Sequence, residues 1–457
     1  MLRYLKKVYN LVDNKRSRDS VSDLKSKFIL LLADMITIVV SLLIGYIIAN
    51  LINYTIGFSS HTFLNASYGF FYIIIPFVFF YEGIYTRRYD FWHELRLIIK
   101  GLLLSLVMIF AYLSLTKEVQ EHSRSVIIIS FFIMSIFIPI IKVFTKKKLF
   151  EIGLWKLGVK ILHDDPAMES MIFNDPYLGY MKSSRKEASI VFINSQNCDI
   201  ELVKKQLEEE ISSKSKVMFL PVFNNYQFSN SDIYELNNSR TNLVVLENKL
   251  SSKYRKFVNT SYNYILAFIL LPLLLPIIGI IAFLIKKDSK GPVFFMQERL
   301  GLDGRTFLVF KFRTMHVNGD EILNEYLKDN PKEKENYEIY CKYDKDPRIT
   351  KIGRILRNTS ADELAQIFNV VKGEMNFVGP RPYMVTEKEK IGATNADVIL
   401  KTKPGITGLW QVSGRNDLSF EDRVKMDKWY IYNWSLWKDF VILIKTVNVV
   451  LNRSGAK

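Results

Sequence analysis

The chain has 457 residues and a formal net charge of +16, and 49% of its residues are hydrophobic. This length allows several folding units. The two cysteines, Cys198 and Cys341, are far apart and show no metal-ligand spacing, which argues against a disulfide framework and fits a reducing compartment. No nucleic-acid recognition motif accompanies the charge, and the basic residues flank apolar runs. We therefore expect a membrane partner and no nucleic acid.

Four apolar runs fill the first third of the chain, at Phe28–Leu51, Tyr68–Tyr85, Leu97–Leu115 and Ser125–Phe144. Each has about 18–24 residues, enough for a helix to cross about 30 Å of hydrocarbon. The runs are apolar on all faces, which favours membrane helices over the buried helices of a soluble protein. Asp34 lies inside the first run and predicts a polar contact within the bundle or near the interface.

Lysine and arginine alternate between the two sides of these runs. Eight basic residues precede the first run, the loop 53–67 has none, and Lys146, Lys147 and Lys148 follow the fourth run. The positive-inside rule therefore places the N-terminus and everything after residue 146 in the cytoplasm. We expect a cytoplasmic segment at 1–27 and a four-helix transmembrane bundle at 28–148.

A fifth apolar run, Tyr264–Ile285, has basic residues at both ends and prolines 272 and 276 at its middle. Proline removes a backbone donor and clashes with the preceding turn, so a helix breaks or kinks there. Since both ends favour the cytoplasm, we expect a re-entrant helix that enters and leaves by one face. A kinked spanning helix is the alternative.

Residues 149–250 are more polar. Short apolar runs at Ala188–Asn194, Lys216–Pro221 and Asn242–Leu246 predict strands, and Cys198–Ile211 predicts a helix. This alternation indicates a small cytoplasmic α/β domain with a parallel sheet, a degenerate Rossmann-like unit. No Gly-rich turn joins the first strand to its helix, so we expect no dinucleotide. Its role is left open, with regulation or oligomerisation as candidates.

Residues 251–457 form the expected catalytic domain. Two short runs joined by an Asp-Gly turn predict a hairpin over 294–312, which brings Arg299, Lys311 and Arg313 close together. These charges are either a solvated basic face or contacts for a lipid headgroup or a nucleotide diphosphate.

A helix is predicted next, because Leu364, Ile367, Phe368 and Val371 recur at helical spacing. Ser360 followed by Glu363 is a capping-box pattern, so Asp362 and Glu363 could simply complement the helix N-terminus. The second interpretation is chemical. Adjacent carboxylates can hold a divalent cation, and an aspartate can accept a phosphoryl group.

Three Gly-containing blocks follow, at residues 379–382, 403–408 and 413–417. Prolines on both sides of Arg381 fix the backbone there, so its guanidinium would be aimed. Arg415 lies in the third block. Ordinary turn chemistry is the alternative for all three.

Together these blocks resemble the bacterial monotopic polyprenyl-phosphate hexose-1-phosphate transferases, in their long form. The resemblance runs from about Lys253 to the C-terminus and rests on seven motifs in order: QERLG (297–301), FKFRTM (310–315), DPRIT (346–350), SADELAQ (360–366), VGPRP (378–382), KPGITG (403–408) and SGRND (413–417). The motif set departs at Ala365, where the family commonly has proline.

The resemblance implies that Asp362 is the nucleophile, which displaces UMP from a UDP-sugar and forms an aspartyl-phosphosugar intermediate. It implies that Asp362 and Glu363 hold Mg²⁺, that Arg299, Lys311, Arg313, Arg381 and Arg415 bind substrate, and that undecaprenyl phosphate accepts the phosphosugar. This would be the first membrane step of exopolysaccharide, capsule or O-antigen assembly, at the cytoplasmic face of the bacterial inner membrane.

The expected fold is a membrane α-helical bundle, a cytoplasmic α/β domain and an α+β catalytic domain with the re-entrant helix 264–285. The C-terminal stretch is rich in Trp and Tyr, which suits either the membrane interface or packing on the core. A non-catalytic membrane scaffold that recruits polysaccharide machinery is the alternative function. The sugar and the polymer pathway are left open, and a homodimer is a candidate assembly.

Overall fold

The computed structural model describes residues 2–56, 69–117, 122–162, 166–183, 188, 190–194, 199–213, 217–220, 232–236, 241–245, 250, 253–329, 346–414 and 418–451. The chain divides into two compact units, Met1–Phe223 and Asn224–Lys457.

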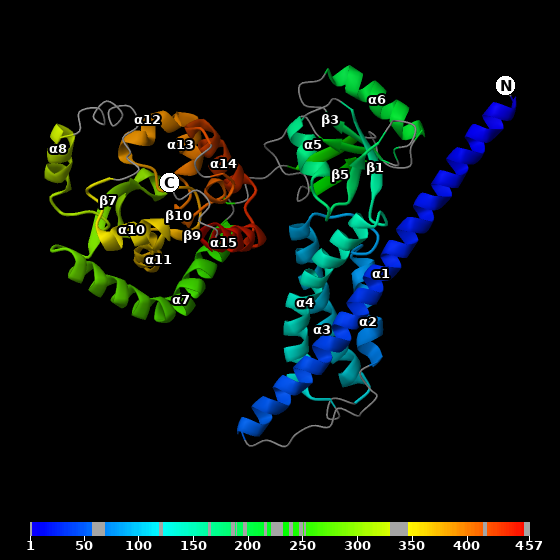
Figure 1. The fold of residues 1–457 in the computed structure, drawn as a ribbon, viewed down its shortest axis with the longest axis horizontal. Coiled ribbons are helices and arrows are strands. Elements are labelled where there is room, and N and C mark those ends of the chain that lie inside the picture. The colour runs from blue at the N-terminus through cyan, green and yellow to red at the C-terminus, as the bar shows by residue number, and fades with distance from the viewer. Residues whose placement is uncertain are drawn as a thin grey trace. The chain divides into compact units, whose positions relative to one another are not determined.

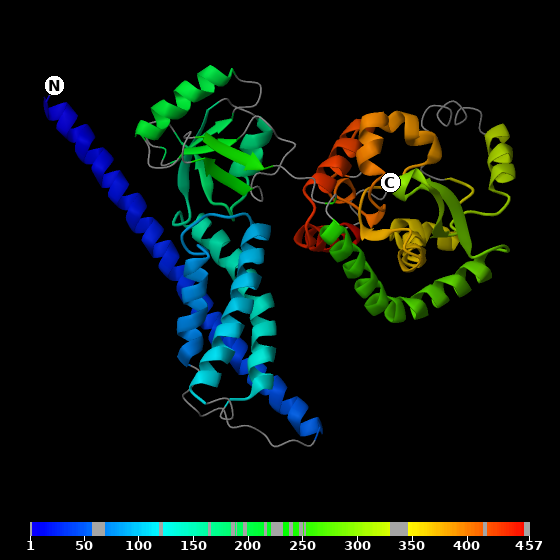
Figure 2. The same cartoon turned by 180° about the vertical axis from the view of Figure 1, so that it is seen from behind.

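The first unit begins with four helices that lie side by side in Figures 1 and 2. They are α1 (Leu2–Ile56), α2 (Phe71–Tyr81), α3 (Phe91–Leu115) and α4 (Arg124–Glu151). Helix α1 packs closely on α4, because a Cβ added at Gly45 would lie 2.1 Å from the Ser130 hydroxyl. Asp90 caps α3 by accepting the backbone N–H groups of Trp92 and His93.

Three of these helices contain segments long and apolar enough to cross a membrane, namely Leu24–Thr55, Phe91–Leu115 and Arg124–Glu151. They correspond to the first, third and fourth predicted runs. The second predicted run, Tyr68–Tyr85, is wrong in length, because its helix covers only Phe71–Tyr81. Gly83, with φ of +76°, follows directly in a left-handed conformation that ends helices.

Buried charges connect the helices of the bundle. Asp34 of α1 pairs with Lys142 of α4 at 2.8 Å and also accepts a hydrogen bond of 2.7 Å from the Tyr85 hydroxyl. Lys146 of α4 donates to Glu94 of α3 in a second buried pair. The prediction that Asp34 makes a polar contact within the bundle is confirmed.

A parallel sheet follows the bundle, as the alternating pattern predicts. Its strand order is β2-β1-β3-β4, and all three pairings are parallel. The elements are β1 (Leu157–Leu162), α5 (Pro166–Phe173), β2 (Tyr180–Lys182), β3 (Ile190–Asn194), α6 (Ile200–Ser213) and β4 (Val217–Leu220). The Arg88 guanidinium lies 4.0 Å from the Trp155 ring centroid and donates to the Leu178 and Gly179 carbonyls, which fixes the bundle to this sheet.

The predicted strand Asn242–Leu246 lies outside this sheet. It corresponds to β6 (Thr241–Val245), which pairs antiparallel with β5 (Asp232–Leu236) and belongs to the second unit. Four residues separate β5 from β6 in the sequence, too few for the long crossover that a parallel pairing needs.

The second unit combines one long helix, short helices and two further small sheets. Its remaining elements are α7 (Lys253–Asp288), β7 (Phe294–Leu300), η5 (Leu302–Gly304), β8 (Thr306–Phe312), α8 (Gly319–Asp329), α10 (Lys351–Asn358), η6 (Ala361–Gln366), α11 (Ile367–Val371), β9 (Asn376–Val378), η7 (Val385–Glu387), α12 (Lys388–Ile391), α13 (Ala393–Ile399), β10 (Gly405–Thr407), η8 (Trp410–Val412), α14 (Phe420–Tyr432) and α15 (Leu436–Leu451).

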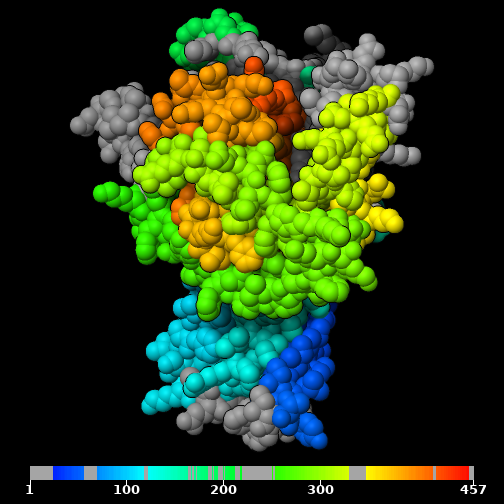
Figure 3. All heavy atoms as spheres, turned by 90° about the vertical axis from the view of Figure 1, so that its left-hand side faces the viewer, coloured from blue at the N-terminus to red at the C-terminus, as the bar shows by residue number. Residues whose placement is uncertain are grey.

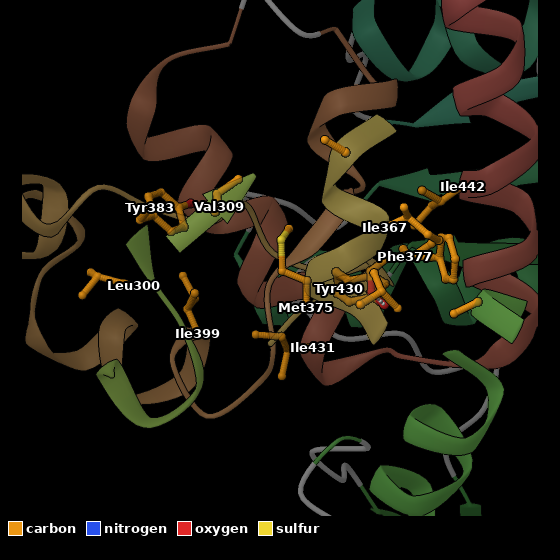
Figure 4. Packing of buried hydrophobic residues seen from close by; sticks show 14 of the residues in the cluster. Leu300, Val309, Ile367, Met375, Phe377, Tyr383, Ile399, Tyr430, Ile431 and Ile442 are labelled. Carbon is orange, nitrogen blue, oxygen red and sulfur yellow. Dashed lines mark hydrogen bonds between the residues drawn. The ribbon is translucent and has the colours of Figure 1, made fainter. Parts of the chain in front are cut away.

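One hydrophobic core joins these elements. Figure 4 shows Leu300 and Val309 from the hairpin, Ile367 from α11, Tyr430 from α14 and Ile442 from α15, all buried. The core therefore holds the hairpin, the Asp-Glu segment and the C-terminal helices in one body, from which the site side chains project.

Helix α7 bends near its middle, where Pro272 and Pro276 lie (Figures 1 and 2). The apolar middle of α7 is largely exposed, because only 11% of its most apolar 18-residue stretch is buried. Among the described helices, α7 is the fourth that is long and apolar enough to span a membrane. In the space-filling view it lies below the yellow-green hairpin (Figure 3).

Both ends of α7 are hydrogen-bonded to other elements of the second unit. Near its start, the Asn263 side-chain oxygen accepts the Phe377 backbone N–H at 2.7 Å, and Asn259 accepts from Asn376 at 2.9 Å. At its end, Asp288 accepts the Ile352 backbone N–H at 3.0 Å. The exposed apolar bend is therefore held at two points by the same core.

Removing one partner of the buried Asp34–Lys142 pair should destabilise the bundle by about 3–5 kcal/mol, because the other charge is left uncompensated. We expect Lys142→Met to lower the Tm of detergent-solubilised protein strongly, and the double variant Asp34→Leu/Lys142→Met to recover much of the loss. Lys148→Met, at an exposed lysine, is the control. Equal Tm values for Lys142→Met and the control would contradict the assignment.

Candidate active site

The hairpin has the predicted bounds. Strands β7 and β8 pair antiparallel from Phe294↔Phe312 to Leu300↔Thr306. Asp303 and Gly304 take φ values of 56° and 73°, the left-handed turn conformation that the Asp-Gly pair favours. Lys311 on β8 and Glu363 form an ion pair of 2.9 Å.

The Asp-Glu pair lies on the 3₁₀ helix η6, which begins just after helix α10 has ended. Helix α10 ends at Asn358, and Ser360 adopts a left-handed φ of 53° before η6 begins. The predicted capping box is wrong, because the Ser360 side chain makes no cap hydrogen bond to η6. The backbone of Ser360 is left-handed, whereas an N-cap residue usually has an extended backbone. The predicted apolar face is partly wrong, because Ile367 is buried but Val371 is exposed.

A 3₁₀ helix has three residues per turn, so successive side chains point about 120° apart. Glu363 lines one cavity and Asp362 lines another, while Lys311 lines both. The two carboxylates therefore face different spaces that share the Lys311 side chain as a wall.

The first cavity, here called the arginine cavity, has a volume of about 220 Å³. Its charged and aromatic lining consists of Arg299, Lys311, Glu363, Arg381, Trp410 and Arg423. The Trp410 ring has the Arg423 guanidinium 5.0 Å from its centroid and that of Arg381 at 5.7 Å. Four cations against one carboxylate make this a space for an anion.

Two glycine-containing loops hold Arg381 in place. The Gly379 N–H donates to the Thr407 carbonyl at 2.9 Å, and the Gly405 N–H donates to the Pro380 carbonyl at 2.8 Å. A Cβ at Gly405 would lie 2.1 Å from the Gly379 nitrogen, so no side chain fits between the loops. The VGPRP and KPGITG motifs are thus packed backbone to backbone.

A buried carboxyl group is hydrogen-bonded to the loop that contains Arg381. Asp427 of α14 accepts hydrogen bonds from the Tyr383 hydroxyl at 2.8 Å and from the Arg381 backbone N–H at 3.3 Å. Burial raises the pKa of Asp427 to about 7, although both hydrogen bonds lower it.

The second cavity, here called the hairpin cavity, has a volume of about 590 Å³. Apolar side chains that include Phe295, Met315 and Val317 line it, together with His316 and the charged residues Lys311, Arg313, Asp320, Arg348, Arg357 and Asp362. Arg357 donates through Nε to the Thr314 hydroxyl at 2.9 Å, and within the described residues its terminal nitrogens have no hydrogen-bond partner.

The electrostatics of Asp362 reflect its place between these groups. Burial raises the pKa of the Asp362 carboxyl, and the neighbouring Glu363 carboxylate raises it further. The positive charges of Lys311 and Arg357 act in the opposite direction. The carboxylate therefore lies in a site where cations must offset the cost of its charge.

Comparison with known proteins identifies the family of this chain. A model described as "Bacterial sugar transferase" matches residues 254–453. An uncharacterized sugar transferase of Haemophilus influenzae is 34% identical over 405 residues, covering 81% of this chain and 85% of that protein. The undecaprenyl-phosphate galactose phosphotransferase of Salmonella typhimurium is 32% identical, with 81% and 84% covered.

The chain belongs to the bacterial sugar transferase family. The UDP-glucose:undecaprenyl-phosphate glucose-1-phosphate transferase of Escherichia coli is also similar, at 34% identity over 265 residues, which cover 56% of this chain and 53% of that one. The similarity to full-length relatives extends well beyond the matched domain. The chain is therefore an enzyme of the sugar-phosphate transferase class, and its apolar helices indicate a membrane protein.

Of the site residues that the sequence predicts, the structure brings Arg299, Lys311, Glu363 and Arg381 together around the arginine cavity of the sugar transferase. Arg313 lies differently. It is buried, and its guanidinium donates to the Ser289 and Lys290 carbonyls at the end of α7, although it also borders the hairpin cavity. Its observed contacts tie β8 to α7. Arg415 lies outside the described residues.

Several residues of these cavities were missed by sequence reasoning, among them Arg357, Trp410 and Arg423. Arg357 and Arg423 occur within helical patterns, where a basic residue reads as an ordinary surface charge. Trp410 lies two positions after the last glycine of the KPGITG motif, and an aromatic residue there was the one available signal.

The donor set suits a magnesium ion of the kind that phosphoryl-transfer enzymes bind. Within the described residues no group of three or more His, Cys, Asp or Glu could hold a metal. Mg²⁺ commonly uses one or two carboxylates and completes its shell with water and substrate phosphate. Asp362 and Glu363 line different cavities, so each supplies one carboxylate to its own cavity, and substrate phosphate and water would complete the shell of a Mg²⁺ ion there.

The raised pKa of Asp427 predicts a pH-dependent stability. The folded sugar transferase binds this proton more tightly than the unfolded chain, whose carboxyl titrates near pH 4. Stability from this group is therefore greatest at low pH and falls as the pH rises from about 4 to about 7.

In Asp427→Asn this contribution is absent, so its Tm should fall less than that of the wild type between pH 5 and pH 8, as measured by thermal unfolding in detergent. Asp397→Asn, at an exposed carboxylate of α13, should keep the wild-type slope. Parallel Tm curves for Asp427→Asn and the wild type would show that Asp427 is charged throughout.

Proposed function

We propose that the chain transfers a sugar-1-phosphate from a UDP-sugar to undecaprenyl phosphate and releases UMP. The observation that carries the proposal is the position of the Asp362–Glu363 pair, which faces two cavities that share Lys311 and are each lined by three arginines. The names of the relatives from Salmonella typhimurium and Escherichia coli, which specify undecaprenyl phosphate as acceptor, support the same substrates.

The donor diphosphate would bind in the arginine cavity, with its sugar-bearing phosphorus beside Lys311, which also lines the cavity that Asp362 faces. Arg381 and Arg423 flank Trp410 there, and neither guanidinium has a carboxylate partner within the described residues. Arg299 donates to the Gln297 side chain at 2.6 Å and to the Pro382 carbonyl, so its remaining donors are oriented. Guanidinium groups bind phosphate through paired, charge-assisted hydrogen bonds, which favours the diphosphate over a neutral ligand.

The chemistry would run in two displacements at one phosphorus atom. A carboxylate oxygen of Asp362 attacks the phosphorus that bears the sugar, and the bond from that phosphorus to the UMP oxygen breaks. UMP leaves with the bonding electron pair. An oxygen of the lipid phosphate then attacks the same phosphorus, and the Asp362 oxygen–phosphorus bond breaks to restore the carboxylate.

The surrounding cations would lower the barrier for both displacements. Lys311 borders both cavities, so it can stabilise charge on the transferring phosphoryl group wherever that group crosses between them. Asp362 and Glu363 would hold Mg²⁺, which offsets the repulsion between carboxylate and diphosphate.

The membrane side is part of the proposal. A straight helix of 36 residues would be about 54 Å long and would end on the opposite face of the bilayer. Helix α7 instead bends, and both of its ends are hydrogen-bonded to the catalytic core. This supports a re-entrant α7, with the catalytic core on the cytoplasmic face where UDP-sugars are available.

Asp362→Asn should abolish turnover, with at least a 10³-fold loss, because the amide cannot act as the nucleophile. The measurement is UMP release in membranes that contain undecaprenyl phosphate, across a panel of UDP-sugars. The same panel identifies the sugar. Asp397→Asn, at an exposed carboxylate, should keep wild-type rates.

Full activity of Asp362→Asn would show that Asp362 is not the nucleophile. A wild-type protein that releases no UMP from any UDP-sugar would instead support a scaffold without catalysis.

Arg423→Gln should raise KM for the UDP-sugar about tenfold, since one charge-assisted phosphate contact is worth about 1.5–3 kcal/mol. Steady-state kinetics at saturating acceptor measure this change. Arg305→Gln, on the exposed hairpin turn, is the matched control. An unchanged donor KM for Arg423→Gln would exclude this arginine from the donor site.

A further inference from the structure

One buried side chain, that of Asn369 on α11, bonds to the free edge of strand β8. Strand β8 pairs with β7 on one side, and within the described residues no strand pairs with its other side. The Asn369 side-chain oxygen accepts the Phe310 backbone N–H at 3.0 Å, and its nitrogen donates to the Leu308 carbonyl at 2.7 Å. The amide therefore takes the place of a peptide group in a neighbouring strand, because it offers one acceptor and one donor in the same way.

A carboxylate fixes the orientation of this amide. The Asn369 nitrogen also donates to the Glu374 carboxylate at 2.7 Å. A flipped amide would point its nitrogen at the Phe310 N–H and its oxygen at the oxygens of Leu308 and Glu374, so that donor would face donor and acceptor would face acceptor. Asn369 is 0% exposed, so water could not relieve either mismatch.

The helical segment that carries Asn369 also carries the Asp-Glu pair. Helix η6 continues directly into α11, so Glu363 and Asn369 belong to one continuous segment. On the strand, Lys311 follows Phe310, and its ammonium pairs with Glu363 at 2.9 Å. Strand β8 and the Asp-Glu segment are therefore joined by buried neutral hydrogen bonds and by one ion pair at the cavity wall.

The remaining contact between the two elements includes packed aromatic rings. Phe368 lies edge-on to Phe294 and Phe310, with ring centroids 6.0 and 6.4 Å apart. Burial of apolar surface is non-directional, so it tolerates small shifts of one element along the other. Hydrogen bonds weaken steeply when their geometry changes. The Asn369 bonds therefore fix the register of β8 more tightly than ring packing does.

We propose that Asn369 is a positioning residue for sugar-phosphate transfer. It sets the register of β8 on the Asp-Glu segment and thereby holds Lys311 at the wall that the two cavities share. This inference rests on the proposed function, in which Lys311 stabilises charge on the transferring phosphoryl group, and it adds the residue that places Lys311. Asn369 lines neither cavity, so it acts without touching either substrate.

The test replaces the nitrogen of the amide by oxygen. Asn369→Asp keeps one acceptor, loses the donor and sets a carboxylate against Glu374. Glu374→Ala removes only the group that orients the amide, so it is the milder variant and decides the question if Asn369→Asp does not fold. Asn395→Asp on α13 is the matched control, because its amide also donates to a backbone carbonyl, that of Ile391 at 3.1 Å, and lines neither cavity.

The first readout is kinetic, measured as UMP release per folded enzyme at a temperature well below the lowest Tm. Asn369→Asp should lower kcat by about tenfold or more and change the donor KM by no more than about threefold, because the three arginines of the arginine cavity still bind the diphosphate. Glu374→Ala should lower kcat about threefold, and the control should keep the wild-type kcat. A lower Tm with an unchanged kcat of the folded enzyme would show a role in stability alone and overturn the proposal.

A second comparison uses Lys311→Met. Adding Asn369→Asp to this variant should lower kcat by no more than about twofold further, since no ammonium is left to position. Two losses that multiply would show that Asn369 acts by another route, which would also overturn the proposal.

The third readout does not depend on turnover. Mass spectrometry of the full chain in detergent measures how fast an N-hydroxysuccinimide ester acylates Lys311 relative to the exposed Lys328 of α8. The Lys311 side chain is 31% exposed and is held by Glu363, so its release in Asn369→Asp should raise this ratio about threefold or more, whereas Asn395→Asp should not change it.

An unchanged acylation ratio in Asn369→Asp would contradict the inference even in a protein that releases no UMP. Absence of UMP release from the wild type, with a raised ratio in Asn369→Asp, would count against the proposed function and leave the placement of Lys311 by Asn369 established.

Discussion

The hydrogen bonds at the two ends of α7 are the constraint on which the rest of the catalytic unit depends. Asn259 and Asn263 hold its start against β9, and Asp288 holds its end against α10. Between these points the helix exposes an apolar bend that water disfavours. The core and the bend cannot move independently. The medium that surrounds the bend therefore also fixes how deep both cavities lie relative to that medium and how they are oriented.

That constraint addresses a problem particular to sugar transferases that use a lipid acceptor, namely that one substrate dissolves in water and the other in hydrocarbon. The arginine cavity is built from motif loops whose backbones interlock at Gly379 and Gly405, so its cations are aimed before any ligand arrives. The hairpin cavity combines apolar side chains with Asp362. Lys311 belongs to both, which makes one lysine the electrostatic link between two differently solvated spaces.

Much of the architecture could be predicted from local sequence. The hairpin bounds, three of the four bundle helices and strands β3 and β4 of the parallel sheet followed from apolar patterns and turn residues, because such patterns depend on short-range sterics and burial. Strands β1 and β2 of that sheet were not predicted. The length of α2 could not be predicted, since Gly83 ends a run that is apolar beyond it. The pairing of β6 with β5 instead of with the parallel sheet also depends on tertiary context.

The site was predicted in its residues more than in its geometry. Motif resemblance identified Arg299, Lys311, Glu363 and Arg381, which the fold brings around one cavity. Arg357 and Arg423 could not be identified, because only the folded chain places these helical charges at the walls of the two cavities. Arg313 has a charge that suits substrate, but its partners are carbonyl groups at a helix end, which no local pattern reveals.

The 3₁₀ turn at Ala361–Gln366 has a consequence for how the active site tolerates change. Three residues per turn assign neighbouring positions to separate compartments, so the two acids are ordered, not merely paired. Exchanging their positions would keep the same charges and composition yet send each side chain into the wrong compartment. Backbone periodicity, more than acidity, thus determines which of the two lines each cavity.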